Sequence, residues 1–407
     1  MLNKNFILTA SLAMAVATSL ATQQAVADLT NGASSSNQSL LISAPLLFDG
    51  TQFLTGQAVL IQDGKITQVA PLNEIQANDA RQINMSTGTI LPGFIDMHTH
   101  HILNAVPPLR MLEHGVTTAR DLGGPTKLVT IKKPYQLRQL ISGPILSKQN
   151  GYPNNVFPGS GIDVKNPANA RAIVDSLVAK GASVIAVSLE AGGEPGAPWM
   201  LHDPIPADNW PVLSDDELSA VMDQAHNVQH VRVVAYLGNE AAAQRALSFG
   251  IDEWAHMPCD LLSTDVITTA VAQNVAIDGT IDTEAECAGV HENAVAFLGA
   301  GGQLFYATDM GHPDIPHGID AQEIHMELHA GMHSGMTFPV AIIKALVSAT
   351  SGAGQYLGLA PLGQIVPGAP ADLIMIDSDP RVNFKELEYP QLVIKNGLVV
   401  IQRAKGE

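Results

Sequence analysis

The chain has 407 residues, of which 46% are hydrophobic and 5% aromatic, and its formal net charge is −18 at pH 7. This composition is typical of a globular α/β protein packed mainly with Ala, Val, Ile and Leu. The strong negative charge argues against nucleic acid and anionic membrane surfaces as partners, because both would repel the protein.

The beginning of the chain has the pattern of a cleavable signal peptide over residues 1–27. Lys4 precedes an apolar and small-residue run at 6–21, and Ala25 and Ala27 provide the small residues that signal peptidase reads. The run is shorter than the roughly 20 residues that a membrane span needs. We therefore expect cleavage after Ala27, a periplasmic or secreted protein, and no membrane span. Residues 28–38 are small and polar, which predicts a flexible leader.

Short strands separated by Gly and Asn turns are predicted near both ends of the chain. They fall at 40–48, 57–61, 65–69, 371–376 and 392–401. Because an α/β region separates them, we expect residues 39–90 and 356–407 to form one small β-sandwich domain.

The middle of the chain, 91–355, alternates short apolar strands with amphipathic helices such as 215–227 and 241–249. This alternation predicts a parallel sheet with crossover helices. The strands are expected at 95–97, 116–120, 144–147, 183–189, 231–236, 251–255, 275–280 and 303–308. Eight such units over this length predict a closed (β/α)8 TIM barrel.

The two cysteines, Cys259 and Cys287, have no metal-ligand spacing. In an oxidising compartment they can form a disulfide. The sequence indicates no distance between them, so buried free thiols remain an equal alternative.

The pair His98 and His100 ends the first predicted barrel strand, in LPGFIDMHTH. Residues i and i+2 on a strand face the same side, and barrel enzymes hold their chemistry at the carboxyl ends of the strands. Asp309 ends the eighth strand, which lies beside the first in a closed barrel. Imidazole and carboxylate are preferred zinc ligands, so these three residues predict a metal site. His256 ends the sixth strand and is expected at the same face.

The segments LPGFIDMHTH, GVTTARDLGG (115–124), GIDEWAH (250–256) and YATDMG (306–311) resemble those of the amidohydrolase superfamily. The segments SATSGAGQYLGLAPLGQIVPGAPADLIMIDSDP and VIKNGLVV near the C-terminus extend the resemblance, which is closest to imidazolonepropionase-like and Xaa-Pro-dipeptidase-like proteins. It implies a TIM barrel with a β-sandwich, one or two divalent metals, and hydrolysis of C–N bonds. By position, His98, His100 and Asp309 would bind the first metal, with Asp309 also the catalytic base. His256 would be a second-metal ligand or a proton shuttle.

The chain departs from the family pattern at two positions that usually support a second metal. Ala186 stands where a carboxylated Lys is usual on the fourth strand, and Tyr236 where a His is usual on the fifth. Glu190 could substitute only if the strand end curls inward, and Lys180 precedes the strand at the wrong end. We therefore expect one ion per chain, Zn²⁺ or another divalent metal, with His256 close by.

Other polar residues near the strand ends are weaker candidates. His312 and His317 follow Asp309 and could contact substrate, and Tyr236 or His256 could stabilise an oxyanion. Arg120 is a candidate for binding a substrate carboxylate, although a structural ion pair is the favoured alternative. A stripe at His325, His329 and His333 has helical spacing. We expect Gly331 to interrupt that helix and the stripe to be solvated or to lie on a substrate loop.

These observations predict a hydrolase that uses metal-activated water on a small amide, cyclic amide or dipeptide-like substrate. The main alternative is a catalytically impaired periplasmic protein that keeps the fold and binds a ligand. A heterocycle deaminase is a further alternative, which the absent fifth-strand His disfavours. A serine nucleophile is not supported, because no G-x-S-x-G turn occurs. Self-association to a homo-oligomer remains open.

Overall fold

The computed structural model describes residues 39–194, 196–197, 210–312 and 314–403. The predicted signal peptide and leader lie outside the described residues. Within the described part of the chain, no helix has both the length and the hydropathy to cross a membrane.

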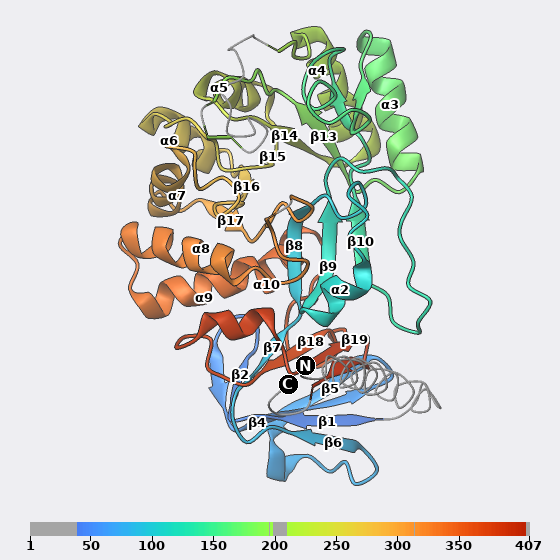
Figure 1. Cartoon of the computed structure of the whole chain (residues 1–407), viewed down its shortest axis with the longest axis vertical. Helices are drawn as coiled ribbons and strands as arrows, with labels where there is room; N and C mark the ends of the chain where they lie inside the picture. The colour runs from blue at the N-terminus through green and yellow to red at the C-terminus, as the bar shows by residue number, and fades with distance from the viewer. Residues whose placement is uncertain (1–38, 195, 198–209, 313, 404–407) are drawn as a thin grey trace, which may run out of the picture.

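Two sheets lie at one end of the molecule, one built from N-terminal strands and the other from strands of both ends of the described chain (Figure 1). One sheet has the order β5-β4-β1-β6, and the other β20-β19-β18-β7-β2-β3. The first contains Lys65–Pro71, Gln57–Gln62, Leu40–Ser43 and Arg81–Asn84; the second contains Leu398–Gln402, Leu392–Lys395, Leu373–Ile376, Thr89–Pro92, Leu46–Phe48 and Phe53–Thr55. Side chains of both sheets, including Ile42, Val59 and Met375, share one buried hydrophobic cluster.

The middle of the chain forms two further sheets, in which every strand pair is parallel. Their orders are β10-β9-β8 and β12-β11-β13-β14-β15-β16-β17. The first contains Arg138–Ile141, Val116–Asp121 and Phe94–Thr99; the second contains Gly161–Asp163, Ile145–Ser147, Val184–Ser188, Arg232–Tyr236, Glu253–Trp254, Ala276–Asp278 and Gln303–Phe305. Eight of these strands overlap the predicted ranges, whereas β10 and β12 are short strands that the alternating pattern did not predict.

Backbone hydrogen bonds join β8, the edge strand of one sheet, to the chain that directly follows β17, the edge strand of the other. Met97 N donates to Tyr306 O at 3.1 Å, and Asp309 N donates to His98 O at 2.9 Å. On the other side, Ser183 N, just before β13, donates to Ile141 O of β10 at 2.9 Å. The result is a TIM-barrel-like α/β fold in which the ends of β8 and β17 are neighbours.

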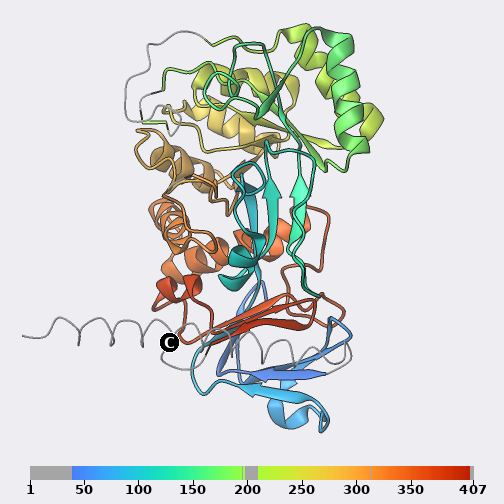
Figure 2. The same ribbon diagram turned by 45° about the vertical axis from the view of Figure 1, so that its right-hand side comes forward.

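Helices follow the strands and lie outside them. In Figure 1, α5 to α9 succeed one another down one side of the molecule, and Figure 2 shows the end sheets stacked below the parallel strands. The helices are α2 (Pro108–Glu113), α3 (Pro167–Ala179), α4 (Asp215–Asp223), α5 (Glu240–Phe249), α6 (Thr264–Ala272), α7 (Val290–Gly299), α8 (Ala321–His333), α9 (Phe338–Ser348) and α10 (Ser351–Tyr356).

Two helix predictions need correction. The predicted helix 215–227 is α-helical only to Asp223 and continues as a π-helical turn at Gln224–Gln229. Gly331 does not interrupt α8, which runs on to His333. A Cβ at Gly331 would lie 3.2 Å from Ala341 Cβ, so the glycine instead allows α8 and α9 to pack closely.

Glu327 is a buried carboxyl group between α8 and α9, where the Ser348 hydroxyl donates to its Oε2 at 2.6 Å. Burial raises its pKa from 4.5 to about 8. Between these values the folded chain keeps a proton that the unfolded chain has lost, so stability is lost as the pH rises through this window. We expect Glu327→Gln to stabilise the fold by about 2 kcal/mol at pH 8 and by much less at pH 5. Urea unfolding at both pH values measures this, and Glu292→Gln on the exposed face of α7 is the control.

Candidate metal centre

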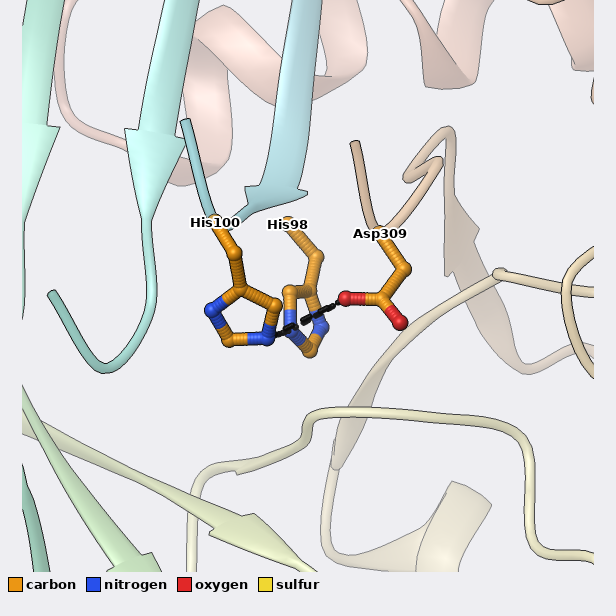
Figure 3. A group of neighbouring side chains, drawn as sticks. All are labelled: His98, His100 and Asp309. Atoms are coloured by element: carbon orange, nitrogen blue, oxygen red, sulfur yellow. Dashed lines mark hydrogen bonds and ion pairs between the residues drawn. The ribbon is translucent and has the colours of Figure 1, made fainter. Parts of the chain in front are cut away.

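Three side chains converge where β8 ends and where the chain leaves β17 (Figure 3). His98 Nε2 lies 3.4 Å from His100 Nε2 and 3.6 Å from Asp309 Oδ1. His100 Nε2 lies 3.1 Å from the same Asp309 oxygen. A tetrahedral ion with bonds of about 2.0–2.1 Å holds its ligand atoms about 3.3 Å apart. The three atoms therefore fit one small divalent metal. Within the described ranges they are the one group of three such ligand atoms lying within 4.8 Å of each other.

The His98 ring is oriented by a contact on its far side. Its Nδ1 lies 2.6 Å from Ala255 O, and a carbonyl can only accept, so Nδ1 carries the proton. The neutral ring then has its lone pair on Nε2, which faces the other two ligands. Burial and the nearby His256 hold the pKa of His98 well below its usual value. His98 is therefore kept in the neutral form that metals bind.

Asp309 is held in place by its backbone and by the preceding residue. Its φ is +56°, a conformation in which Asp is several-fold enriched among non-Gly residues. Thr308 donates from its hydroxyl to Asp96 Oδ2 at 2.6 Å, which anchors the segment to β8. Burial alone would raise the pKa of Asp309, but His100 and then His98 outweigh it and lower that pKa. The carboxylate is therefore ionised and can act as a ligand or a base.

His256 lies beside this group but does not share its ligand geometry. Its ring centroid is 4.5 Å from that of His98. Its Nδ1 lies 3.0 Å from Thr280 Oγ1 and 3.1 Å from Glu284 Oε1. Burial, followed by the charge of His100, lowers its pKa to about 3. His256 is thus outside the group of three clustered ligand atoms, and its role as a further metal ligand or a proton shuttle stays a prediction.

The positions of the usual Lys and fifth-strand His are occupied as the sequence indicates. Ser188 lies opposite Tyr236 and Ala186 opposite Val234, so by alternation Ala186 and Tyr236 face the same side. The Tyr236 hydroxyl lies 3.0 Å from His98 Nε2 and donates to Leu122 O at 2.5 Å. A phenol therefore stands beside the first metal ligand.

Glu190, the candidate substitute for the strand-four Lys, has its carboxyl group bonded next to its own strand end. It is buried just past the end of β13, and its Oε1 accepts from Gly192 N at 2.6 Å. Its carboxylate is not part of the three-ligand group.

The assignment of Arg120 to substrate binding is corrected. The side chain is 2% exposed, and its guanidinium donates to Met97 O, to Glu253 and to Asp278. These partners lie inside the barrel-like sheet and occupy the guanidinium. Arg120 thus forms structural ion pairs, which was the alternative that the sequence favoured over binding a substrate carboxylate.

The remaining histidine candidates are outside the three-ligand group. His312 N donates to Asp309 O at 3.1 Å, and its partly exposed side chain stays a predicted substrate contact. His317 lines a different pocket, with His114 and Tyr389. The stripe on α8 makes ring contacts of its own, with His325 and His329 centroids 4.4 Å apart. It is outside the three-ligand group.

Sequence reasoning missed several residues around the centre. Asp278 ends β16 and lies 3.8 Å from His98 Nδ1, and the strand-end argument that found Asp309 would have found it. Glu284 lies in a loop, where no periodic signal marks it. The ring of Tyr152, which stacks on Trp210 at 6.0 Å and lies 5.9 Å from Tyr236, adds an aromatic wall. Cys259 and Cys287, whose state was left open, form a disulfide.

Comparison with known proteins decides the family. Residues 89–400 match the family model described as the amidohydrolase family. The chain belongs to this family. A comparison with curated protein sequences found no match.

Solved structures show how far this amidohydrolase fold extends. A prolidase complexed with N-methylphosphonate-L-proline is 21% identical, with a TM-score of 0.72, over 90% of this chain and 100% of that chain. A Xaa-Pro dipeptidase with bound methionine is also 21% identical, with a TM-score of 0.71, over 89% and 99%. The ochratoxinase of A. niger is 20% identical, with a TM-score of 0.71, over 90% and 96%. These similarities confirm the predicted resemblance to Xaa-Pro-dipeptidase-like proteins and cover nearly the whole described chain.

Proposed function

We propose that this amidohydrolase hydrolyses a C–N bond in a small amide, cyclic amide or dipeptide-like substrate by means of metal-activated water. The observation that carries the proposal is the set of three ligand atoms, 3.1 to 3.6 Å apart, held by His98, His100 and Asp309. They lie at the carboxyl ends of parallel strands, where barrel enzymes hold their chemistry. Family membership and the names of the similar structures, a prolidase and a Xaa-Pro dipeptidase, support the bond type.

The side chains around the centre fit the steps of such a reaction. A divalent metal held there would supply a Lewis acid and lower the pKa of bound water. Asp309, ionised at neutral pH, would take the proton of the attacking water and pass it to the departing nitrogen. The Tyr236 hydroxyl beside His98 would stabilise the developing oxyanion once its proton turns from Leu122 O toward the substrate. His256, a neutral ring beside His98, would serve as the proton shuttle.

We infer one ion per chain rather than two. A methyl group at Ala186 and a phenol at Tyr236 cannot provide the bridging carboxylate and the imidazole that a second ion would need. The described residues contain no second group of three ligand atoms at comparable separation.

Metal analysis of the purified protein, combined with a hydrolysis screen, tests the proposal. We expect one zinc-like ion per chain and metal-dependent cleavage of at least one X-Pro dipeptide or N-acyl amino acid. Two ions per chain would contradict the one-metal site. A metal-free, inactive protein that still binds these compounds would support the alternative, a catalytically impaired protein that keeps the fold and binds a ligand.

We also propose a closed (β/α)8 barrel at 91–355, a β-sandwich from 39–90 and 356–407, and export with cleavage after Ala27. The hydrogen bonds between β8 and the end of β17 support the closure of the barrel.

The disulfide supports export to an oxidising compartment. N-terminal sequencing of the mature protein should begin at Asp28, and a sequence beginning at Met1 would refute export by cleavage.

Replacing Tyr236 with Phe should lower kcat about 10- to 100-fold and change KM little, because the lost hydroxyl would act on the developing charge. Steady-state kinetics on the best substrate of the screen, with metal content measured in parallel, checks this. Tyr389→Phe is the matched control, since Tyr389 is 58% exposed and lies in another pocket. An unchanged kcat would remove Tyr236 from the mechanism.

A further inference from the structure

We propose that Glu284 is the positioning residue of His256, and that the disulfide Cys259–Cys287 holds the two loops that carry them in register. This inference rests on the proposed hydrolase function.

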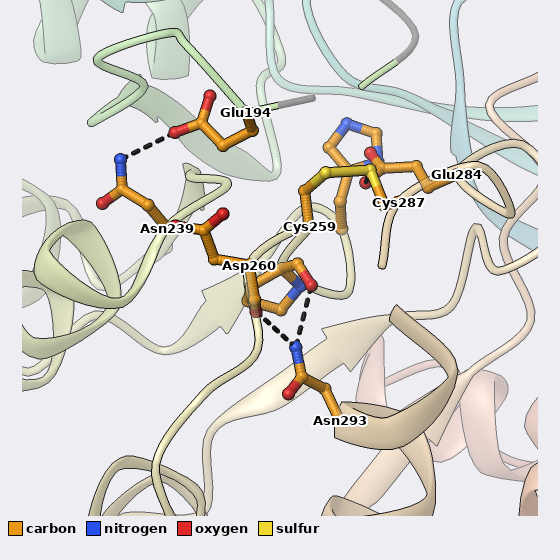
Figure 4. The surroundings of a disulfide bond; sticks show 9 residues. Glu194, Asn239, Cys259, Asp260, Glu284, Cys287 and Asn293 are labelled. Carbon is orange, nitrogen blue, oxygen red and sulfur yellow. Dashed lines mark hydrogen bonds and ion pairs between the residues drawn. A yellow bond between two sulfur atoms is a disulfide. The ribbon is translucent and has the colours of Figure 1, made fainter. Parts of the chain in front are cut away.

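The disulfide joins two loops at matching positions. His256 follows β15 and precedes Cys259 by three residues, while Glu284 follows β16 and precedes Cys287 by three residues. The cysteine Cα atoms are 4.8 Å apart, and Figure 4 shows the sulfur bridge beside the Glu284 side chain. A bond at this place limits how far the two loops can slide past each other.

The contact between the loops determines which nitrogen of His256 carries a proton. The Thr280 hydroxyl donates to Gly279 O at 2.9 Å, so its oxygen accepts from His256 Nδ1 at 3.0 Å. Glu284 Oε1 lies 3.1 Å from the same nitrogen. The Thr280 acceptor and the close Glu284 oxygen both favour a proton on Nδ1, and together they restrict the orientation of the ring.

Glu284 needs a constraint because its surroundings are unfavourable for a carboxylate. It is 1% exposed, and burial, followed by the charges of Asp309, Glu190 and Glu194, raises its pKa well above the usual value. Burial and neighbouring negative charge disfavour a carboxylate at this position, so the covalent bond helps to keep Glu284 beside His256.

The fold around the bridge does not depend on the disulfide alone. Asn293 of α7 donates to Pro258 O at 2.9 Å and to Asp260 O at 2.8 Å, and Gly289 N donates to Cys259 O at 2.8 Å. These bonds hold the Cys259 loop against α7. Removal of the disulfide should therefore loosen the contact between Glu284 and His256 without unfolding the domain.

Two variants test the inference: Cys259→Ser/Cys287→Ser, which removes the bond, and Glu284→Ala, which leaves the chain covalently intact. We expect kcat to fall about 10-fold in the first and about 30-fold in the second, while KM and metal content change little. Glu284→Gln should recover most of kcat, because its amide oxygen can still accept from Nδ1. Glu292→Ala, exposed on α7, is the control with wild-type kinetics.

A readout independent of activity separates this inference from the proposed function. Long-range ¹H–¹⁵N spectra of histidine-labelled protein, assigned with a His256→Gln variant, report the tautomer of His256. We expect a proton on Nδ1 in the wild type and a mixture of tautomers in Glu284→Ala and in the double serine variant. If the wild type fails to hydrolyse any substrate, the proposed function fails while this measurement still applies. Unchanged tautomer and unchanged kcat in Glu284→Ala would overturn the inference.

Discussion

Replacing Asp309 with Asn should remove the bound metal and reduce hydrolysis at least about 10³-fold. Asp309 is the one anionic member of the ligand group, and its Oδ1 lies 3.1 Å from His100 Nε2 and 3.6 Å from His98 Nε2. A neutral amide neutralises no metal charge and cannot accept a proton from water. Asn tolerates the positive φ of this position, so the backbone should stay as it is.

Metal content by elemental analysis and initial rates on one substrate together measure this effect. We expect less than about 0.1 ion per chain in the variant after dialysis, from one in the wild type. Asp314→Asn, an exposed residue of the same loop, is the control with full metal content and activity. An Asp309→Asn variant that keeps both its metal and its activity would show that the three-ligand group is not the active centre.

The core of this site was predictable from the sequence because it depends on strand order. His98 and His100 share a strand face, and an eighth strand beside the first brings Asp309 to them. The regular strand β17 ends at Phe305, earlier than predicted. The chain beyond it still hydrogen-bonds to β8, through Met97 to Tyr306 and His98 to Asp309, so the predicted proximity was right.

Residues whose roles depend on loops or on distant partners were not predictable in this way. Glu284 and the disulfide lie in loops whose paths no periodic pattern describes. Arg120 meets Glu253 and Asp278 from strands that are 133 and 158 residues away in the sequence. Which charges meet inside a barrel-like sheet depends on side-chain packing in three dimensions, whereas hydrophobic periodicity reports only which residues are buried.

That buried network supplies the second large effect: Arg120→Met should destabilise the fold by about 3–5 kcal/mol. The guanidinium donates to both Glu253 and Asp278, each fully buried, and its Nε donates to Met97 O at 2.7 Å. Burial and the neighbouring Glu253 already raise the pKa of Asp278 well above its usual value, and Arg120 opposes this. Without the arginine, two carboxyl groups would face each other in the interior with no cation between them.

Urea unfolding at pH 7, with metal removed from all samples, measures the loss of stability directly. Arg171→Met is the control, because its ion pair with Asp223 is 41% and 48% exposed and should contribute less than about 1 kcal/mol. Adding Glu253→Gln to Arg120→Met should restore part of the lost stability, because it removes one of the two unpaired carboxyl groups. If Arg120→Met lost no more stability than Arg171→Met, the buried ion pairs of Arg120 would not stabilise the strand ends near His98. A large loss of stability in Arg120→Met, partly recovered in the double variant, would show that the ion pairs of Arg120 with Glu253 and Asp278 stabilise the strands that carry the metal centre. These residues come together only in the folded chain.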